Sequence, residues 1–151
     1  VEIDPSIKQL KNLVLLELRQ LLSLSKMPAD LGSMESLEEL LIGWTKLKSI
    51  AVGTSMKKLK VLTAFDCKSL TEVPSSVGSL TSLTKNSFDY TGITELPDNI
   101  GSLVNLGILY LLRVPLMELV ESIGRLTSLT ELHSMDIITE LPDSIGNMKS
   151  L

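Results

Sequence analysis

Cysteine and aromatic residues are scarce in this sequence of 151 residues, which has one cysteine, one tryptophan, two tyrosines and two phenylalanines. The single cysteine excludes a scaffold stapled by disulfide bonds. Long apolar runs are also missing, because the densest one, residues 106–112, is far shorter than the roughly 18 to 20 residues that a membrane-spanning helix needs. A formal net charge of −4 argues against a chain whose main task is to neutralise the phosphates of a nucleic acid.

Aliphatic side chains supply most of the hydrophobic content of the sequence, because aromatic residues are few. Hydrophobic residues make up 44% of the chain, and 31 residues are leucine. A chain with this apolar content can offset the entropy cost of ordering its backbone, so we exclude an intrinsically disordered segment. The length is that of one ordinary domain.

The leucines belong to an internal repeat. One motif is written as MPADLGSMESL (27–37), VPSSVGSLTSL (73–83), LPDNIGSLVNL (96–106), LVESIGRLTSL (119–129, with valine in place of proline) and LPDSIGNMKSL (141–151). Together with two degenerate copies, its last leucine defines seven anchors that are 22 to 24 residues apart: Leu13, Leu37, Leu59, Leu83, Leu106, Leu129 and Leu151. Self-similarity at such a period indicates a stacked repeat architecture.

The residues after each anchor follow the pattern L-x-x-L-x-L, as in Leu106, Leu109 and Leu111. Alternation with a period of two predicts a short strand, and the whole pattern is the leucine-rich-repeat signature. We therefore predict an α/β repeat solenoid, a right-handed superhelix or horseshoe segment with short parallel strands on its concave face and loops or short 3-10 turns on its convex face. The prediction is a single domain over residues 1–151 with about six repeats, a truncated seventh beginning at Leu151, and no capping repeats.

The return segment, which leads from one strand to the next, contains proline, glycine and an apolar residue at recurring positions. Each proline, such as Pro97, should fix φ at the start of the return turn. The glycine five residues before an anchor, such as Gly101, should mark either a close approach that excludes a Cβ or a positive φ. The apolar residue before that glycine, here Ile100, should fill the outer side of the core. Asn86 departs from the pattern because it replaces a strand leucine, and we expect its amide to be paired or reached by water, since an unpaired amide costs about 1–3 kcal/mol.

The turns that follow the strands carry a family resemblance. Cys67 lies three residues before Leu70, and Thr45 and Thr91 occupy similar turns. Such turns, joined to L-P-x-x-I-G-x-L-x-x-L, resemble the repeat region of plant intracellular nucleotide-binding leucine-rich-repeat disease-resistance receptors. The resemblance is closest to the class with a Toll/interleukin-receptor amino-terminal domain, and it covers essentially the whole chain.

This resemblance implies a protein-recognition module that senses a pathogen effector or a host protein and contributes to autoinhibition of its receptor. Its partners would be those proteins or other domains of the parent receptor. The alternative is a constitutive intracellular scaffold similar to the Ras-group leucine-rich repeats, which use the same L-P-x-x-I-G segment. The chain has no cysteine pair and no N-x-[ST] acceptor, so we expect a cytoplasmic setting. Uncapped ends lead us to expect self-association or fraying there.

The residues between the strand leucines should form a concave face that contacts protein. Most of the few aromatic residues fall on or beside it, and exposed apolar patches rimmed by charge mark contact sites. The candidates are Leu15, Glu17, Arg19, Leu41, Trp44, Val61, Phe65, Lys85, Asp89, Tyr90, Ile108, Tyr110, Leu112, Arg113, Glu131, His133 and Met135. The alternative is that the rings fold over the strand row or pack on neighbouring segments of a longer parent.

The sequence offers no arrangement suited to catalysis. Cys67 and His133, the single cysteine and histidine, should lie three repeats or about 14 Å apart, too far for a nucleophile and its base. A metal site needs several converging ligands, which are also missing. We predict a chain that is not an enzyme, holds no cofactor or metal, and binds neither nucleic acid nor membrane.

Charge is distributed unevenly along the sequence. Residues 46–68 hold six lysines and one acid, whereas residues 89–151 hold nine acids and three basic residues. Such asymmetry can steer partners by its field. The recurring acids, among them Glu95, Asp98, Glu140 and Asp143, are expected on the outer return side as a solvated row.

Overall fold

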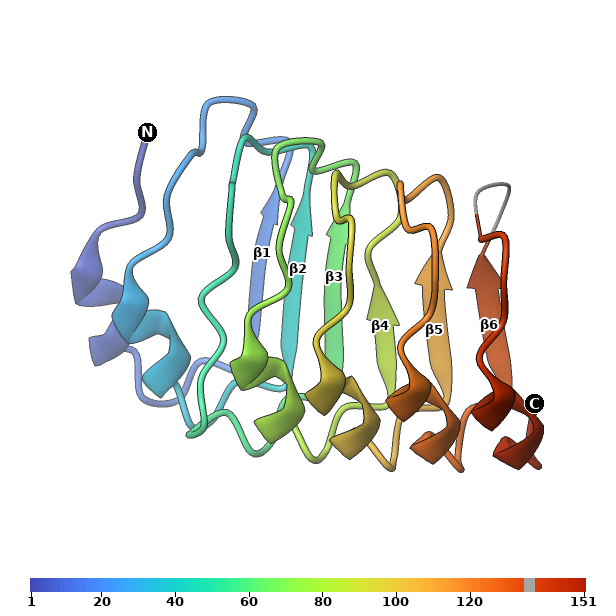
Figure 1. Cartoon of the computed structure of the whole chain (residues 1–151). Coiled ribbons are helices and arrows are strands. Elements are labelled where there is room, and N and C mark those ends of the chain that lie inside the picture. The colour runs from blue at the N-terminus through green and yellow to red at the C-terminus, as the bar shows by residue number, and fades with distance from the viewer. Residues whose placement is uncertain (135–137) are drawn as a thin grey trace.

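The computed structural model describes residues 1–134 and 138–151, which form a stack of similar coils (Figure 1). Its six strands are β1 (Leu15–Arg19), β2 (Glu39–Gly43), β3 (Val61–Phe65), β4 (Lys85–Ser87), β5 (Ile108–Leu111) and β6 (Glu131–Ser134). Its six 3-10 helices are η1 (Pro5–Gln9), η2 (Ala29–Ser33), η3 (Ser75–Ser79), η4 (Asp98–Ser102), η5 (Glu121–Arg125) and η6 (Asp143–Asn147). None of the helices in these residues is long and apolar enough to cross a bilayer.

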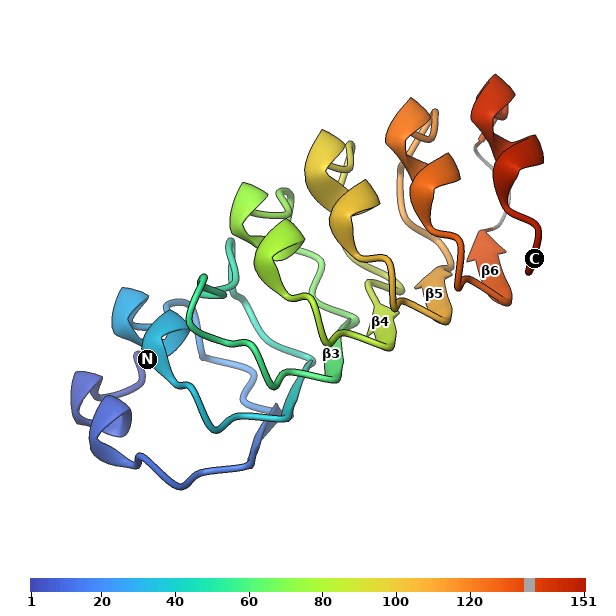
Figure 2. The same ribbon diagram turned by 90° about the horizontal axis from the view of Figure 1, so that it is seen from below.

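The strands form one parallel sheet in the order β1-β2-β3-β4-β5-β6, which confirms the predicted solenoid. Equivalent leucines pair across it, since Leu16 is opposite Leu40 and Leu40 is opposite Leu62. The register continues to the last strand, where Leu109 pairs with Leu132. In Figure 2 the strands lie closer together than the 3-10 helices do, so the sheet lines the concave side and the helices the convex side.

The space between sheet and helices is filled by one continuous aliphatic core. The five inner anchors from Leu37 to Leu129 are fully buried, whereas Leu13 is half-buried and Leu151 is exposed. The apolar residues before the glycines close the core from the outer side, and Leu31, Val77, Ile100 and Ile123 have no exposed surface. Each coil therefore buries its leucines against the coils on either side, as expected for a solenoid.

The return segments confirm the predicted role of proline. Pro28, Pro74, Pro97 and Pro142 each precede a 3-10 helix with φ between −65° and −71°. Val120 adopts the same conformation, with φ −66° and ψ 146°, so η5 forms without a proline. The return between β2 and β3 forms no such helix, and Gly53 stands there where the other returns place their apolar core residue.

The repeated glycines mark close contact between neighbouring coils. A Cβ built on Gly78 would lie 2.6 Å from the Asn99 carbonyl oxygen, and one on Gly101 would collide with the Ser122 carbonyl. The close-approach explanation is confirmed for the repeated glycines except Gly146 in the last coil, where no atom lies within 4 Å of an added Cβ. No glycine of the described residues has a positive φ, so the positive-φ explanation is wrong. The left-handed conformation instead occurs at five larger residues that each follow a strand: Gln20, Trp44, Asp66, Tyr90 and Arg113.

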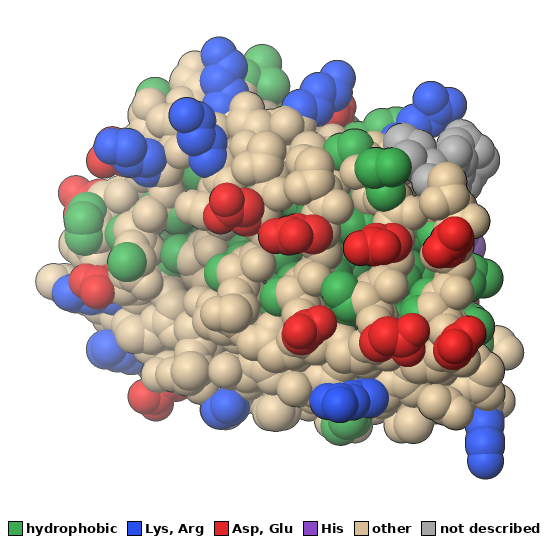
Figure 3. Space-filling view, in the orientation of Figure 1, with side chains coloured by type: hydrophobic (Ala, Val, Ile, Leu, Met, Phe, Trp, Pro, Cys, Tyr) green, Lys and Arg blue, Asp and Glu red, His purple; other side chains and the backbone are tan. Residues whose placement is uncertain are grey.

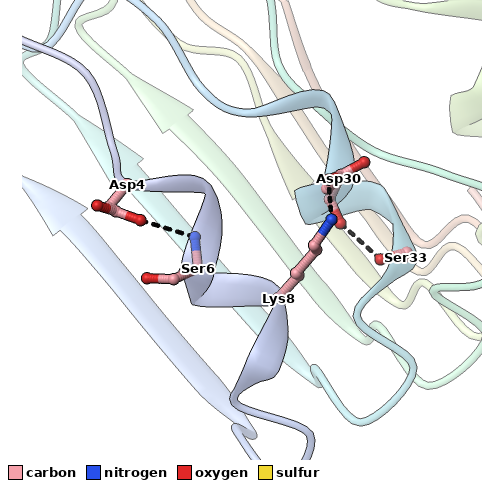
Figure 4. A network of polar contacts seen from close by, with 5 residues as sticks. All are labelled: Asp4, Ser6, Lys8, Asp30 and Ser33. Carbon is pink, nitrogen blue, oxygen red and sulfur yellow. Dashed lines mark hydrogen bonds and ion pairs between the residues drawn. The ribbon is translucent and has the colours of Figure 1, made fainter.

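Figure 4 shows an ion pair that joins the first coil to the second, together with hydrogen bonds within each of the two coils. Asp4 caps η1 by accepting a hydrogen bond from the Ser6 amide at 2.8 Å, and Lys8 of the same helix pairs with Asp30 of η2. The Ser33 hydroxyl donates to the Asp30 carbonyl at 2.6 Å. Both partners of the ion pair are about half exposed, so the pair contributes little stability beyond positioning.

Asn86 is the main defect of the core. Its side chain is fully buried between the register positions of Leu62 and Leu109, and neither its amide nitrogen nor its oxygen has a hydrogen-bond partner in the protein. The expected pairing with protein groups is therefore wrong. Strand β4 is also the shortest of the six, with three residues.

Replacing Asn86 with leucine should stabilise the chain, because the change removes a desolvated amide and restores the aliphatic row. We expect Asn86→Leu to raise the free energy of unfolding by about 1–3 kcal/mol in urea titrations followed by circular dichroism. Asn12→Leu, at an exposed position, is the control and should leave stability nearly unchanged. A loss of stability in Asn86→Leu would contradict this account.

The glycine contacts give a paired test. Gly101→Ala should destabilise the chain by about 1–3 kcal/mol, because the new methyl group meets backbone rather than a flexible side chain. Gly146→Ala should cost nothing and can gain about 0.4–1 kcal/mol through the unfolded state, since no atom lies within 4 Å of the added Cβ. Thermal unfolding of both variants checks the difference, and equal effects would refute the close-contact explanation.

Candidate protein-contact face

The concave face is built from three columns of side chains that run across the sheet. Alternate residues of each strand point away from the core, and the parallel register places equivalent residues side by side. The first column holds Leu15, Glu39, Val61, Lys85, Ile108 and Glu131, and the middle column holds Glu17, Leu41, Thr63, Ser87, Tyr110 and His133. The third holds Arg19, Gly43 and Phe65 and continues past the ends of β4 and β5 to Asp89 and Leu112. The candidate Met135 lies outside the described residues.

Three aromatic rings from successive repeats contact one another along the end of this face. The ring centroids of Trp44 and Phe65 are 4.9 Å apart, and those of Phe65 and Tyr90 are 5.4 Å apart, both in edge-to-face arrangement. Trp44 and Tyr90 are 38% and 39% exposed, and Phe65 between them is half-buried. Much of this aromatic surface therefore remains in contact with solvent, which is unusual for a side chain whose role is core packing.

The outer two rings owe their position to the backbone. Trp44 and Tyr90 have φ values of 52° and 58°, in the left-handed region that costs a non-glycine residue about 1–2 kcal/mol. Their amides donate to carbonyls of the next repeat, Trp44 to Phe65 at 3.0 Å and Tyr90 to Leu112 at 2.8 Å. These bonds hold the chain in the unfavourable conformation. Arg113 follows β5 in the same way and its side chain is exposed.

A second, polar cluster lies further along the middle column. The Tyr110 hydroxyl donates to Glu131 at 3.3 Å, the His133 ring nitrogen lies 3.3 Å from the same carboxylate oxygen, and the two rings are 4.6 Å apart. Lys85 extends over the Tyr110 ring with its Nζ 5.6 Å from the centroid, a cation–π geometry. Burial raises the pKa of the Tyr110 phenol, and the negative charge of Glu131 raises it further.

Asp89 differs from the other candidates because it is buried. Its carboxylate accepts a hydrogen bond from the Leu112 amide at 2.6 Å and another from the Ser87 hydroxyl at 3.2 Å. The first bond supports the chain just past β5, in a position that the shortened β4 leaves without a strand partner. Within this structure Asp89 therefore joins two coils.

The two clusters border a shallow hollow of about 330 Å³ in the middle of the concave face. It is lined by Arg19, Trp44, Thr63, Phe65, Lys85, Ser87, Asp89 and Tyr110. Thr63 and Ser87 follow the same period-two pattern as the candidates and stand in the middle column, level with Tyr110. Arg19 on its rim lies 3.5 Å from Glu17, so a positive and a negative group stand together there.

The remaining candidates are aliphatic and surround these clusters. Leu41, Val61, Ile108 and Leu112 are half-buried, and Leu15 is exposed at the open side of β1. They form the apolar part of the face between its charged groups. The expectation that these residues contact a protein stays a prediction.

The single cysteine and the single histidine of the sequence, Cys67 and His133, do not converge. Cys67 is fully buried, with its sulfur 3.3 Å from the Thr45 hydroxyl, whereas His133 is exposed on β6, three strands away. A buried thiol in such surroundings is unreactive. In residues 1–134 and 138–151, no three His, Cys, Asp or Glu side chains are grouped closely enough to hold a metal ion.

Solved structures with the same architecture cover 99% or more of this chain. A leucine-rich-repeat protein of Leptospira interrogans is 25% identical with a TM-score of 0.66, over 99% of this chain and 44% of that one. The leucine-rich-repeat domain of the type III effector XopL is 23% identical with a TM-score of 0.74, over 99% of this chain and 50% of that one. The leucine-rich-repeat ectodomain of the Arabidopsis receptor kinase HAESA, in complex with an extended IDA peptide hormone ligand, is 23% identical with a TM-score of 0.73, over 100% and 27%.

These similarities establish the leucine-rich-repeat fold for this chain. The chain spans half or less of each of these proteins, which come from bacterial and plant sources. No family model and no curated protein sequence matches it. The similarity therefore identifies the architecture and leaves the partner to be argued from the surface.

The polar cluster makes a measurable prediction. Glu131→Gln should lower the pKa of Tyr110 towards the ordinary phenol value, because the charge of Glu131 opposes ionisation while the effect of burial remains. Ultraviolet absorbance of the phenolate during a pH titration measures the change, and Tyr110→Phe assigns the signal. An unchanged titration would show that the two residues do not interact in solution.

Proposed function

We propose that this chain recognises a protein through its concave face, as the sensing segment of an intracellular plant immune receptor. The observation that carries the recognition role is the row of partly exposed rings from Trp44 through Phe65 to Tyr90. Aromatic side chains gain more than any others from being covered by a partner, and they lose little conformational freedom on binding.

The hollow beside these rings gives the face its specificity. Lys85 and Arg19 present positive charge at its edge, and the hydroxyls of Thr63 and Ser87 provide polar groups inside it. A partner segment that fits would place an apolar side chain against Phe65 and Tyr110 and a polar or acidic group near Lys85. The HAESA structure, which contains a peptide hormone, shows that a solenoid of this architecture occurs in a peptide complex.

The receptor role is supported by the sequence resemblance described above. In such a receptor the ligand would be a pathogen effector or a modified host protein. In the resting state the same face would pack on another domain of the parent, and the ligand would shift the population towards the active form. Binding and release by one surface would then account for both sensing and autoinhibition.

The experiment uses the tagged chain as bait in plant cytosol from healthy and infected tissue, followed by mass spectrometry. A receptor segment should retain a pathogen protein or a modified host protein that appears on infection. A constitutive scaffold should retain the same partners from both tissues, and that outcome would refute the immune role.

Substitutions locate the binding surface in the same assay. Phe65→Ala combined with Tyr110→Ala should weaken retention of the partner at least tenfold, because both rings lie at the centre of the face. Val104→Ala, at an exposed position on the return side of the coil, is the matched control and should have no effect. Equal retention by the double variant and the control would remove the concave face as the binding site.

A further inference from the structure

A groove lined by apolar and acidic side chains runs along the opposite, convex side of the molecule. It consists of two adjoining hollows of about 700 and 370 Å³ that share Glu118 and Val120. The first lies between residues 94–98 and 115–120, and the second between residues 118–121 and 140–143. We call these two hollows the outer groove.

The floor of the outer groove contains apolar side chains that reach solvent. Met117 is 64% exposed, although it is large and apolar. Pro97, Val120 and Pro142 are half-buried and line the floor as well. Leu96 reaches the floor from the core, in which it is buried. Exposed apolar surface rimmed by charge is typical of a contact site.

Carboxylates form both walls of the outer groove. One wall holds Glu95, Glu118 and Glu140, and the other holds Asp98, Glu121 and Asp143 in the first turns of η4, η5 and η6. Figure 3 shows the acidic side chains as two rows on this face with apolar surface between them. All six are exposed, and among the described residues none of them forms an ion pair.

Repulsion between these carboxylates destabilises the coil. The backbones of Glu118 and Glu140 pair in a parallel bridge, so their like charges face each other across neighbouring repeats. Like charges in that position are destabilising. No three of the acids that the structure describes are close enough to share a metal ion, so one cation cannot neutralise the walls.

We propose that the outer groove binds an extended basic segment of a partner protein, in which lysine or arginine alternates with aliphatic residues. Side chains of an extended strand point alternately to its two faces. The aliphatic face would cover Met117 and Val120, while the long basic side chains reach over the rim to both walls. Complementary charge selects this occupant over nucleic acid or an acidic peptide.

This second site is independent of the concave face, since the two share no lining residue. A chain with both sites could bind one partner on its concave face and another in the outer groove. The outer contact would be weakened by salt, because its charges lie on the surface.

The test measures affinity for a synthetic ten-residue peptide of alternating lysine and valine, acetylated and amidated, by fluorescence anisotropy with the 151-residue chain. The triple variant Glu95→Gln, Glu118→Gln and Glu140→Gln should bind it about tenfold more weakly, since each exposed ion pair contributes modestly. The matched control, Glu2→Gln with Asp30→Asn and Glu35→Gln, changes the net charge equally at the other end of the molecule and should bind nearly as well as the unmodified chain. Equal weakening in both variants would overturn the proposal, because attraction by the overall field would then explain the binding.

Two further measurements separate the floor from the walls. A lysine–glycine peptide of equal charge should bind several-fold more weakly, and Met117→Ser should weaken binding of the lysine–valine peptide alone. Equal affinity for the two peptides, or no binding of either, would refute the groove. Phe65→Ala with Tyr110→Ala should leave this binding unchanged, so failure here is distinguishable from failure of the concave site.

Discussion

Each coil of this molecule depends on its neighbours, because one turn of 22 to 24 residues cannot enclose its own leucines. The exact register of the parallel strands brings the anchors of adjacent coils together, and the inner anchors lose all contact with water as a result. Stability therefore arises at the surfaces between coils. The same constraint orders the outside of the molecule, since every residue that is repeated in the sequence becomes a row in space.

The two faces follow from this arrangement in different ways. On the concave side the columns vary in chemistry from strand to strand, which creates a hollow bordered by rings and cations. On the convex side the motif repeats its acids with little change, so identical charges accumulate in lines. A varied surface can distinguish one partner from another, whereas a uniform surface matches a partner that is itself repetitive.

Much of the fold could be predicted from the sequence, because spacing alone determines which residues share a row. The strands, the proline turns and the burial of the inner anchors all follow from the period. The left-handed residues after the strands could not be predicted, since Trp44 and Tyr90 have no intrinsic preference for that conformation and adopt it through bonds to the next coil. The hydrogen bond from the Leu112 amide to the buried Asp89 carboxylate could not be predicted either, because it depends on β4 ending after three residues.

At the five left-handed positions, the backbone conformation of the coil is independent of the side chain. Glutamine, tryptophan, aspartate, tyrosine and arginine all adopt the same backbone geometry at this point, so the geometry does not depend on which side chain is present. Trp44 lines the concave hollow, and the other four side chains are exposed or half-buried. Evolution could therefore exchange residues in this row freely and alter what the protein binds, while the architecture that presents them stays the same.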